Sequence, residues 1–130
     1  MTIDENLLVS AAVAARAHAH APYSSFAVGA ALESTDGRVF SGCNVENASF
    51  GLTVCAERNA LGAAIAAGAR KFRRIAVVSR GAAAPCGACR QVLSEFGIEL
   101  EVLRADDAGT IVARTTLRAL LPEHFGPQQL

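Results

Sequence analysis

The run RIAVVS at residues 74–79 is short, apolar and rich in β-branched side chains. Such a run indicates a strand in the middle of a sheet, buried on both faces. Helix-forming segments flank it at 55–67 and at 86–96, and each is followed by a glycine, Gly68 or Gly97, at the position where helices end. The 55–67 segment is apolar almost all round, so we expect it to be a buried helix. A strand between two helices favours an α/β fold.

The N-terminal part of the chain predicts a helix followed by a hairpin. Thr2 and Glu5 have capping-box spacing, and the helix that they begin should continue to about residue 19, before Pro22. Strands are predicted at 26–32 and 38–45. The Asp-Gly pair between them is typical of a tight turn, so the two strands should be antiparallel.

The C-terminal part predicts two further strands, at 98–103 and 110–114, and a short helix at 116–121. The turn at 106–109 is too short for a crossover connection, so these strands should also be antiparallel. Alternating helices and strands imply an α/β, three-layer α-β-α sandwich around a five-stranded mixed sheet. We expect a single domain over residues 1–130.

Composition excludes several classes of protein. Hydrophobic residues make up 52% of the 130, so intrinsic disorder is not expected. Twelve basic residues balance twelve acidic ones, which disfavours nucleic-acid and anionic-membrane partners. The sequence has no signal-peptide pattern and no apolar stretch long enough for a membrane span. We therefore expect a cytoplasmic protein whose four cysteines stay reduced.

Three of these cysteines are spaced for a metal. Cys86 and Cys89 lie at positions i and i+3 of a predicted helix start, with Cβ atoms about 5–6 Å apart. Cys55 lies at the start of another predicted helix, and a helix N-terminus favours the thiolate that binds metal. Three such thiolates predict one Zn²⁺ per chain, with the fourth tetrahedral position open to water as in catalytic sites.

Two charged residues follow Cys55 in the sequence. Glu57 is not needed as a ligand, and a carboxylate beside the open position is placed to move a proton of the water there. Three thiolates and Zn²⁺ sum to a negative charge. Arg58 is the candidate to offset that charge by hydrogen bonding to the thiolates.

Other interpretations of these cysteines remain open at this point. Pro-Cys-x-x-Cys also occurs in redox pairs, but those normally follow the first strand of a thioredoxin-like unit, and here the motif is late. A closed zinc site, for example in a zinc-stabilised RNA-binding module, would need a fourth ligand. Cys43 lies within a predicted strand and is expected to be a small buried apolar residue. His18, His20 and His124 lie near the chain ends and are expected to be packed or exposed.

The motif Cys-Ala-Glu at 55–57 followed by Pro-Cys-x-x-Cys at 85–89 is the signature of zinc deaminases. The chain resembles, over nearly its whole length, the small homotetrameric cytidine deaminases of pyrimidine salvage. The similar blocks are PYSSFAVGA at 22–30, GCNVENA at 42–48, LTVCAER at 52–58, PCGACRQ at 85–91, and the ending LLP at 120–122 with FG at 125–126. The family often has Tyr where this chain has Phe50, which removes any contact that needs that hydroxyl.

The resemblance implies hydrolytic deamination of cytidine and 2′-deoxycytidine, small-molecule substrates, in a homotetramer whose sites are completed by neighbouring subunits. It also implies a role for each matching residue: Cys55, Cys86 and Cys89 bind zinc, Glu57 is the catalytic proton shuttle, Phe26 stacks on the pyrimidine, Asn44 and Glu46 bind the ribose hydroxyls, the backbone of Ala56 meets the base edge, Arg58 bonds the thiolates, and Phe125 enters a neighbouring subunit's site. The loop 81–84 is alanine-rich and no role is expected for it.

Deaminases of other substrates are the nearest alternatives. An enzyme that deaminates nucleotides would need a cluster of Arg or Lys to bind the phosphate. Glu46 would repel that phosphate. Enzymes that act on adenosine in tRNA usually carry His in the first ligand position, where this chain has Cys55. Deamination of a cytosine-containing antibiotic stays open, because those enzymes share the zinc motifs.

Overall fold

The computed structural model describes residues 3–130, so Thr2 of the expected capping box lies outside the described residues. Asp4 is the N-cap of the first helix, and its side chain accepts a hydrogen bond from the backbone N–H of Asn6. The helices and strands are α1 (Glu5–Arg16), β1 (Val28–Ser34), β2 (Val39–Cys43), α2 (Ala56–Ala66), β3 (Phe72–Ser79), α3 (Gly87–Ser94), β4 (Glu101–Ala105), β5 (Ile111–Thr116) and α4 (Leu117–Leu120).

The strands form one five-stranded mixed sheet in the order β2-β1-β3-β4-β5. β1 is antiparallel to both β2 and β3, β3 is parallel to β4, and β4 is antiparallel to β5. Both predicted hairpins and the mixed character of the sheet are therefore confirmed. β3, which contains the RIAVVS run, is the central strand and is buried from Arg74 to Ser79.

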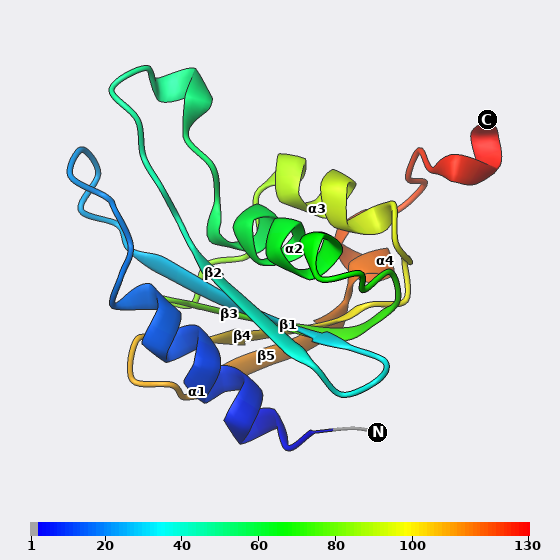
Figure 1. Cartoon of the computed structure of the whole chain (residues 1–130), viewed down its shortest axis with the longest axis horizontal. Coiled ribbons are helices and arrows are strands. Elements are labelled where there is room, and N and C mark those ends of the chain that lie inside the picture. Colours follow the sequence, from blue (N-terminus) through cyan, green and yellow to red (C-terminus); the bar gives the residue numbers. More distant parts are fainter. Residues whose placement is uncertain (1–2) are drawn as a thin grey trace.

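Helices cover both faces of the sheet, as the three-layer prediction required. In Figure 1, α1 lies on one side of the sheet, and α2 and α3 lie together on the other. Each face has its own apolar core. Leu8, Ala31, Val78 and Leu103 belong to the core under α1, and Leu32, Leu61, Ile75, Leu93 and Val102 belong to the core under α2 and α3.

Two strand glycines let helices approach the sheet closely. A Cβ atom at Gly29 would overlap the carbonyl oxygen of Ala12 in α1. A Cβ at Gly42 would lie 2.5 Å from the backbone nitrogen of Ala60 in α2. The first half of α2 therefore rests directly on the backbone of β2, and this contact fixes where the N-terminus of α2 lies.

The end of α1 and the start of β4 differ most from the predictions, because tertiary hydrogen bonds compete with local propensity. α1 ends at Arg16 rather than near residue 19, and the chain after it pairs with the segment beyond β2: the N–H of His20 donates to the carbonyl of Asn44 at 3.0 Å. β4 begins at Glu101 rather than at 98. The carbonyls of Ile98 and Leu100 instead accept from the N–H groups of Arg118 and Leu117, at 2.8 Å each.

Two burial predictions were wrong. α2 is buried on one face only, and Gly62, Ala63 and Ala66 on its other face are exposed. Cys43, expected to be a small buried apolar residue, lies at the last position of β2, an edge strand of the sheet, and is partly exposed. Across residues 3–130, no helix combines the length and the apolar character that a membrane crossing requires.

Candidate active site

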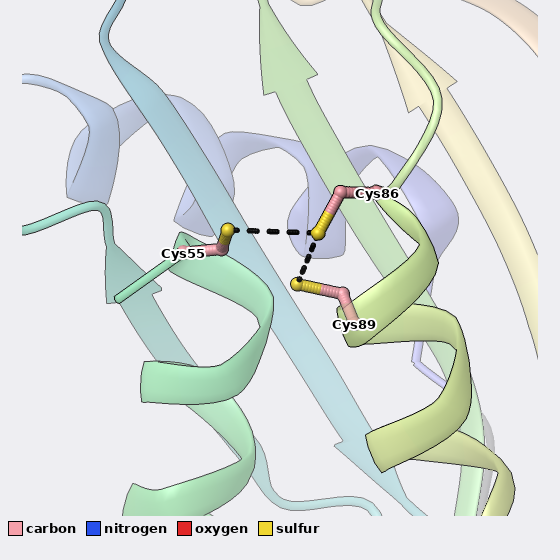
Figure 2. Close-up of side chains that lie close together, drawn as sticks. All are labelled: Cys55, Cys86 and Cys89. Atoms are coloured by element: carbon pink, nitrogen blue, oxygen red, sulfur yellow. Dashed lines mark hydrogen bonds between the residues drawn. The ribbon is translucent and has the colours of Figure 1, made fainter. Parts of the chain in front are cut away.

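The three cysteines singled out by their spacing come together at the N-termini of two neighbouring helices. Cys55 is the N-cap of α2, Cys86 is the N-cap of α3, and Cys89 lies in the first turn of α3. Figure 2 shows their side chains converging from the two helix ends. Cys86 Sγ lies 3.8 Å from Cys55 Sγ and 3.5 Å from Cys89 Sγ, and all three sulfurs lie within 4.8 Å of one another.

This cluster fits a single zinc ion. Tetrahedral ligands at 2.3 Å from zinc lie about 3.8 Å from one another, which matches the observed sulfur separations. Among the residues that the structure describes, no His, Asp, Glu or further Cys joins the cluster. Cys55, Cys86 and Cys89 would therefore hold zinc and leave the fourth position open, as predicted for a catalytic rather than a closed structural site.

The surroundings of the cluster favour thiolate at Cys55. The hydrogen bond from the Cys89 thiol has the largest effect, and the Arg58 guanidinium adds to it, so that the pKa of Cys55 falls to about 5 against the opposing effect of burial. Arg58 Nη2 lies 3.5 Å from Cys55 Sγ. The same sharing raises the pKa of Cys89, which keeps the proton in the metal-free chain. Arg58 thus contacts Cys55, and the pKa of its guanidinium is raised by hydrogen bonds to Cys55 and Cys89.

Glu57 lies beside this cluster in the first turn of α2 and is only 4% exposed. Burial raises the pKa of its carboxyl, the charge of Cys55 raises it further, and Arg58 opposes the shift. A carboxyl whose pKa is shifted toward neutrality can both accept and donate a proton at physiological pH. Glu57 therefore has the burial and the position of an acid–base group.

A cavity of about 180 Å³ opens over the cysteine cluster. It brings together Phe26, Asn44, Ala56 and Glu57, four of the residues that the resemblance implied. The full lining is Phe26, Val28, Asn44, Thr53, Cys55, Ala56, Glu57, Val77, Ser79, Ala83, Ala84 and Cys86. An aromatic ring, apolar walls and a few converging polar groups are typical of a small-molecule site.

Asn44 organises the chain around Phe26. Its Oδ1 accepts from the backbone N–H of Val28 at 2.9 Å, and its Nδ2 donates to the carbonyl of Phe26 at 2.8 Å. Ser25, just before Phe26, has φ +58°, a left-handed conformation that is unfavourable for a residue with a side chain. Backbone strain of this kind is often found at functional sites.

Glu46 lies in a neighbouring depression that shares Thr53 with the cavity. Its carboxylate accepts from the backbone N–H groups of Tyr23, at 2.9 Å, and Ser24, at 3.2 Å, and also from the Ser24 hydroxyl. These hydrogen bonds, the hydroxyl's first, lower the pKa of Glu46. Glu46 is therefore an anion at the edge of the cavity.

Phe125 lines neither the cavity nor the neighbouring depression of its own chain. Its side chain is 59% exposed, and its backbone carbonyl accepts a hydrogen bond from Gln91 Nε2 at 2.8 Å. In Figure 1 the C-terminal segment leaves the body of the protein beyond α3 and α4. This placement neither uses Phe125 within the chain nor assigns it to another subunit.

The sequence prediction missed the loop 81–84. Ala83 and Ala84 line the cavity, and the N–H of Ala83 donates to Ser79 Oγ at 2.9 Å. The place of this loop in the sequence could have indicated its role. The loop follows the carboxyl end of β3, and ligands in open α/β sheets bind at the carboxyl ends of strands. A run of alanines carries no polar signal of its own.

Comparison with known proteins identifies the family of the chain. The family model for the cytidine and deoxycytidylate deaminase zinc-binding region matches residues 1–104. The chain is 41% identical over 135 residues to a cytidine deaminase of Sporosarcina psychrophila, covering 98% of this chain and 96% of that protein. It is 48% identical over 131 residues to a cytidine deaminase of Mycobacterium tuberculosis, covering 98% and 94%. The crystal structure of cytidine deaminase from Burkholderia pseudomallei is similar at a TM-score of 0.89 and 53% identity, covering 95% of this chain and 100% of that one.

Proposed function

The chain belongs to the cytidine and deoxycytidylate deaminase family, and from that premise we propose that it hydrolyses cytidine and 2′-deoxycytidine to uridine and 2′-deoxyuridine with release of ammonia. The observation that carries the proposal is the position of Glu57, a buried carboxyl beside the three-cysteine cluster, in the cavity that Phe26 lines. A metal site, an acid–base group and an aromatic platform in one cavity are the parts that this hydrolysis needs.

Cys55, Cys86 and Cys89 would hold the zinc, which when bound supplies the Lewis acidity that lets a water ionise near neutral pH. Glu57 accepts the proton of that water and delivers it to N3 of the pyrimidine ring. The resulting hydroxide adds to C4. Glu57 then takes the second proton from the added hydroxyl and delivers it to the amino group, so that the C4–N bond breaks, ammonia leaves and the C4 carbonyl of the product forms. One carboxyl is base and then acid, and its raised pKa suits both tasks.

The walls of the cavity bind the nucleoside. Phe26 stacks on the pyrimidine, and the backbone of Ala56 meets the edge of the base. Asn44 keeps one N–H and one lone pair beyond its bonds to Phe26 and Val28, so it can still bind a ribose hydroxyl. The Glu46 carboxylate has about four acceptor positions, of which three are used, so it can accept one more hydrogen bond from a hydroxyl.

The charge of Glu46 favours a nucleoside over a nucleotide. Its lowered pKa keeps it ionised at neutral pH, and an anion at the edge of the cavity repels a phosphate. The substrate we propose is therefore a small uncharged molecule, with no nucleic acid or membrane as partner.

We further propose that the chain forms a homotetramer in which Phe125 enters a neighbouring subunit's site. The exposed apolar surface supports this: Phe125 is 59% exposed, Phe50 73% and Leu52 66%. Sizing in solution tests the assembly, and a fully active monomer would contradict it.

We also propose that the protein works in the cytoplasm. The cytoplasm is a reducing compartment, which keeps the three thiols that the metal requires free.

The test of the activity is ammonia release from a substrate panel: cytidine, 2′-deoxycytidine, cytosine, the two 5′-monophosphates, adenosine and a cytosine-containing nucleoside antibiotic. We expect turnover with the two free pyrimidine nucleosides and none with the Glu57→Gln variant. Turnover of the antibiotic alone, or of the monophosphates in preference to the nucleosides, would contradict the proposal.

A further inference from the structure

We propose that Arg80 is a positioning residue for Phe26 and sets the orientation in which the ring faces the nucleoside; this rests on the proposed function. The Arg80 guanidinium carbon lies 5.9 Å from the centroid of the Phe26 ring, within the cation–π range of about 6 Å. Phe26 lines the cavity and Arg80 does not. The cation therefore contacts the ring from outside the space that the pyrimidine would occupy.

The Phe26 ring is the interaction partner of the Arg80 guanidinium. Within residues 3–130, the Arg80 side chain forms no ion pair or side-chain hydrogen bond, and its guanidinium lies over the ring of Phe26. The other cations near the cavity are engaged elsewhere: Arg58 with Cys55, and Arg104 with the carbonyl of Ala82. Arg80 is exposed, so its charge costs little desolvation.

The backbone that carries Arg80 is held in a braced turn. The N–H of Ala82 donates to the carbonyl of Ser79 at 3.0 Å, and the N–H of Ala83 donates to the Ser79 hydroxyl at 2.9 Å. Arg104 Nη1 donates to the carbonyl of Ala82 at 3.1 Å. Ala82 has φ +51°, a conformation that persists because these bonds hold it. Arg80 thus starts from a fixed position at the end of β3.

The backbone of Phe26 is fixed as well. Its N–H donates to Ser24 Oγ at 3.0 Å, and its carbonyl accepts from Asn44 Nδ2 at 2.8 Å. These bonds fix the backbone and leave the rotation of the ring to side-chain contacts, of which the Arg80 cation supplies one. A ring ordered in advance lowers the entropy cost of binding. Because the ring contacts ground state and transition state alike, the effect should fall on KM and not on kcat.

The test compares Arg80→Met, which keeps the length of the side chain and removes its charge, with Arg114→Met. Arg114 is an exposed arginine on the far edge strand β5 that pairs with Glu5, so its variant controls for loss of a surface charge. We expect Arg80→Met to raise KM for cytidine about two- to fivefold with kcat unchanged, Arg80→Lys to restore it, and Arg114→Met to have no effect. An unchanged KM in Arg80→Met would overturn the proposal, as would a fall in kcat that Lys does not rescue.

A double-mutant cycle separates stacking on the ring from other roles. In a Phe26→Leu background, Arg80→Met should have no further effect on KM, because the ring on which it acts is gone. A full effect in that background would overturn the proposal. So would a loss confined to cytidine 5′-monophosphate, which would assign Arg80 to a phosphate.

Two separate measurements, turnover and binding, distinguish failure of the Arg80 proposal from failure of the proposed function. Wild-type ammonia release tests the activity. The ratio of cytidine Kd values between Glu57→Gln and Glu57→Gln/Arg80→Met, measured by calorimetry, tests Arg80 without turnover. A ratio of about two to five supports the positioning role, and a ratio of one contradicts it.

Discussion

The side-chain nitrogen of Asn44 donates a hydrogen bond to the backbone carbonyl of Phe26, 2.8 Å away. Because Asn44 Oδ1 also accepts from the N–H of Val28, one buried amide spans the residues on which the aromatic wall of the cavity depends. The residue expected to bind the ribose thus also holds in place the residue expected to stack on the base.

Replacing Asn44 with Asp should weaken both stability and substrate binding. Asp keeps the acceptor for Val28 but loses the donor to Phe26 and places a carboxylate oxygen against a carbonyl. We expect a loss of about 1–3 kcal/mol in the free energy of unfolding, measured by denaturant titration, and a higher KM for cytidine. Asn47→Asp is the matched control, because its acceptor bond to Ser49 is retained on an exposed loop. Equal effects of the two substitutions would contradict this account.

Zinc content should depend on three cysteines and not on the fourth. Metal analysis of Cys43→Ser should give about one zinc per chain, as in the wild type, while Cys86→Ser should retain much less. Removing zinc with a chelator should lower the melting temperature of the wild type and of Cys43→Ser, because a ligand that binds the folded chain stabilises it. A zinc-free Cys43→Ser variant would show that the ligand set is wrong.

The raised pKa of Glu57 predicts how stability changes with pH in the metal-free chain. Because the folded pKa lies above the ordinary value of 4.5, the folded chain holds this proton more tightly than the unfolded chain. Stability from this group is therefore present at low pH and is lost as pH rises through the folded pKa. Glu57→Gln, which cannot ionise, should melt close to the wild type near pH 4 and above it at pH 7–8.

The Glu57→Gln variant should also separate zinc binding from activity. It should retain about one zinc per chain, because Glu57 is not among the clustered ligands, while ammonia release collapses. If the metal-free variant melts below the wild type at neutral pH, then burial of the charged carboxylate does not destabilise the chain.

The contact between α1 and the sheet should not tolerate a methyl group. Gly29→Ala places a Cβ against the carbonyl of Ala12, so α1 must move away from β1. We expect a loss of about 1–3 kcal/mol in the free energy of unfolding by denaturant titration. Gly62→Ala is the control, because a Cβ there meets no atom within 4 Å and the site is helical, so it should stabilise the chain by about 0.5–1 kcal/mol. Similar losses at both positions would contradict the close packing of α1.

The parts of this molecule that the sequence predicted are those with local signals. The β-branched run of β3, the Asp-Gly turn between β1 and β2, and the cysteine spacings each indicate structure over a few residues, and the structure confirms all three. The residues predicted to contact the substrate were instead identified by resemblance to a family. Physical chemistry alone does not distinguish Phe26 from a core aromatic.

The features that the sequence did not predict depend on contacts between distant segments. α1 stops at Arg16 because the backbone of His20 pairs with that of Asn44, although Ala17 and Ala19, which lie between Arg16 and His20, favour helix. The stack of Arg80 on Phe26 joins two loops, 54 positions apart by the numbering, that meet because β1 and β3 are adjacent. Neither residue carries a local sign of the other.

Neither Cys55 nor Cys86 caps its helix with a side-chain hydrogen bond, and the positive ends of the α2 and α3 dipoles lie where the three cysteines come together. The N–H groups at these ends belong to the main chain, and no side-chain replacement short of proline removes them. Part of the electrostatic support for the metal is therefore insensitive to point mutation. Substitutions can therefore change the walls of the cavity, and with them the range of molecules that bind, while the metal-binding cluster of Cys55, Cys86 and Cys89 keeps this support.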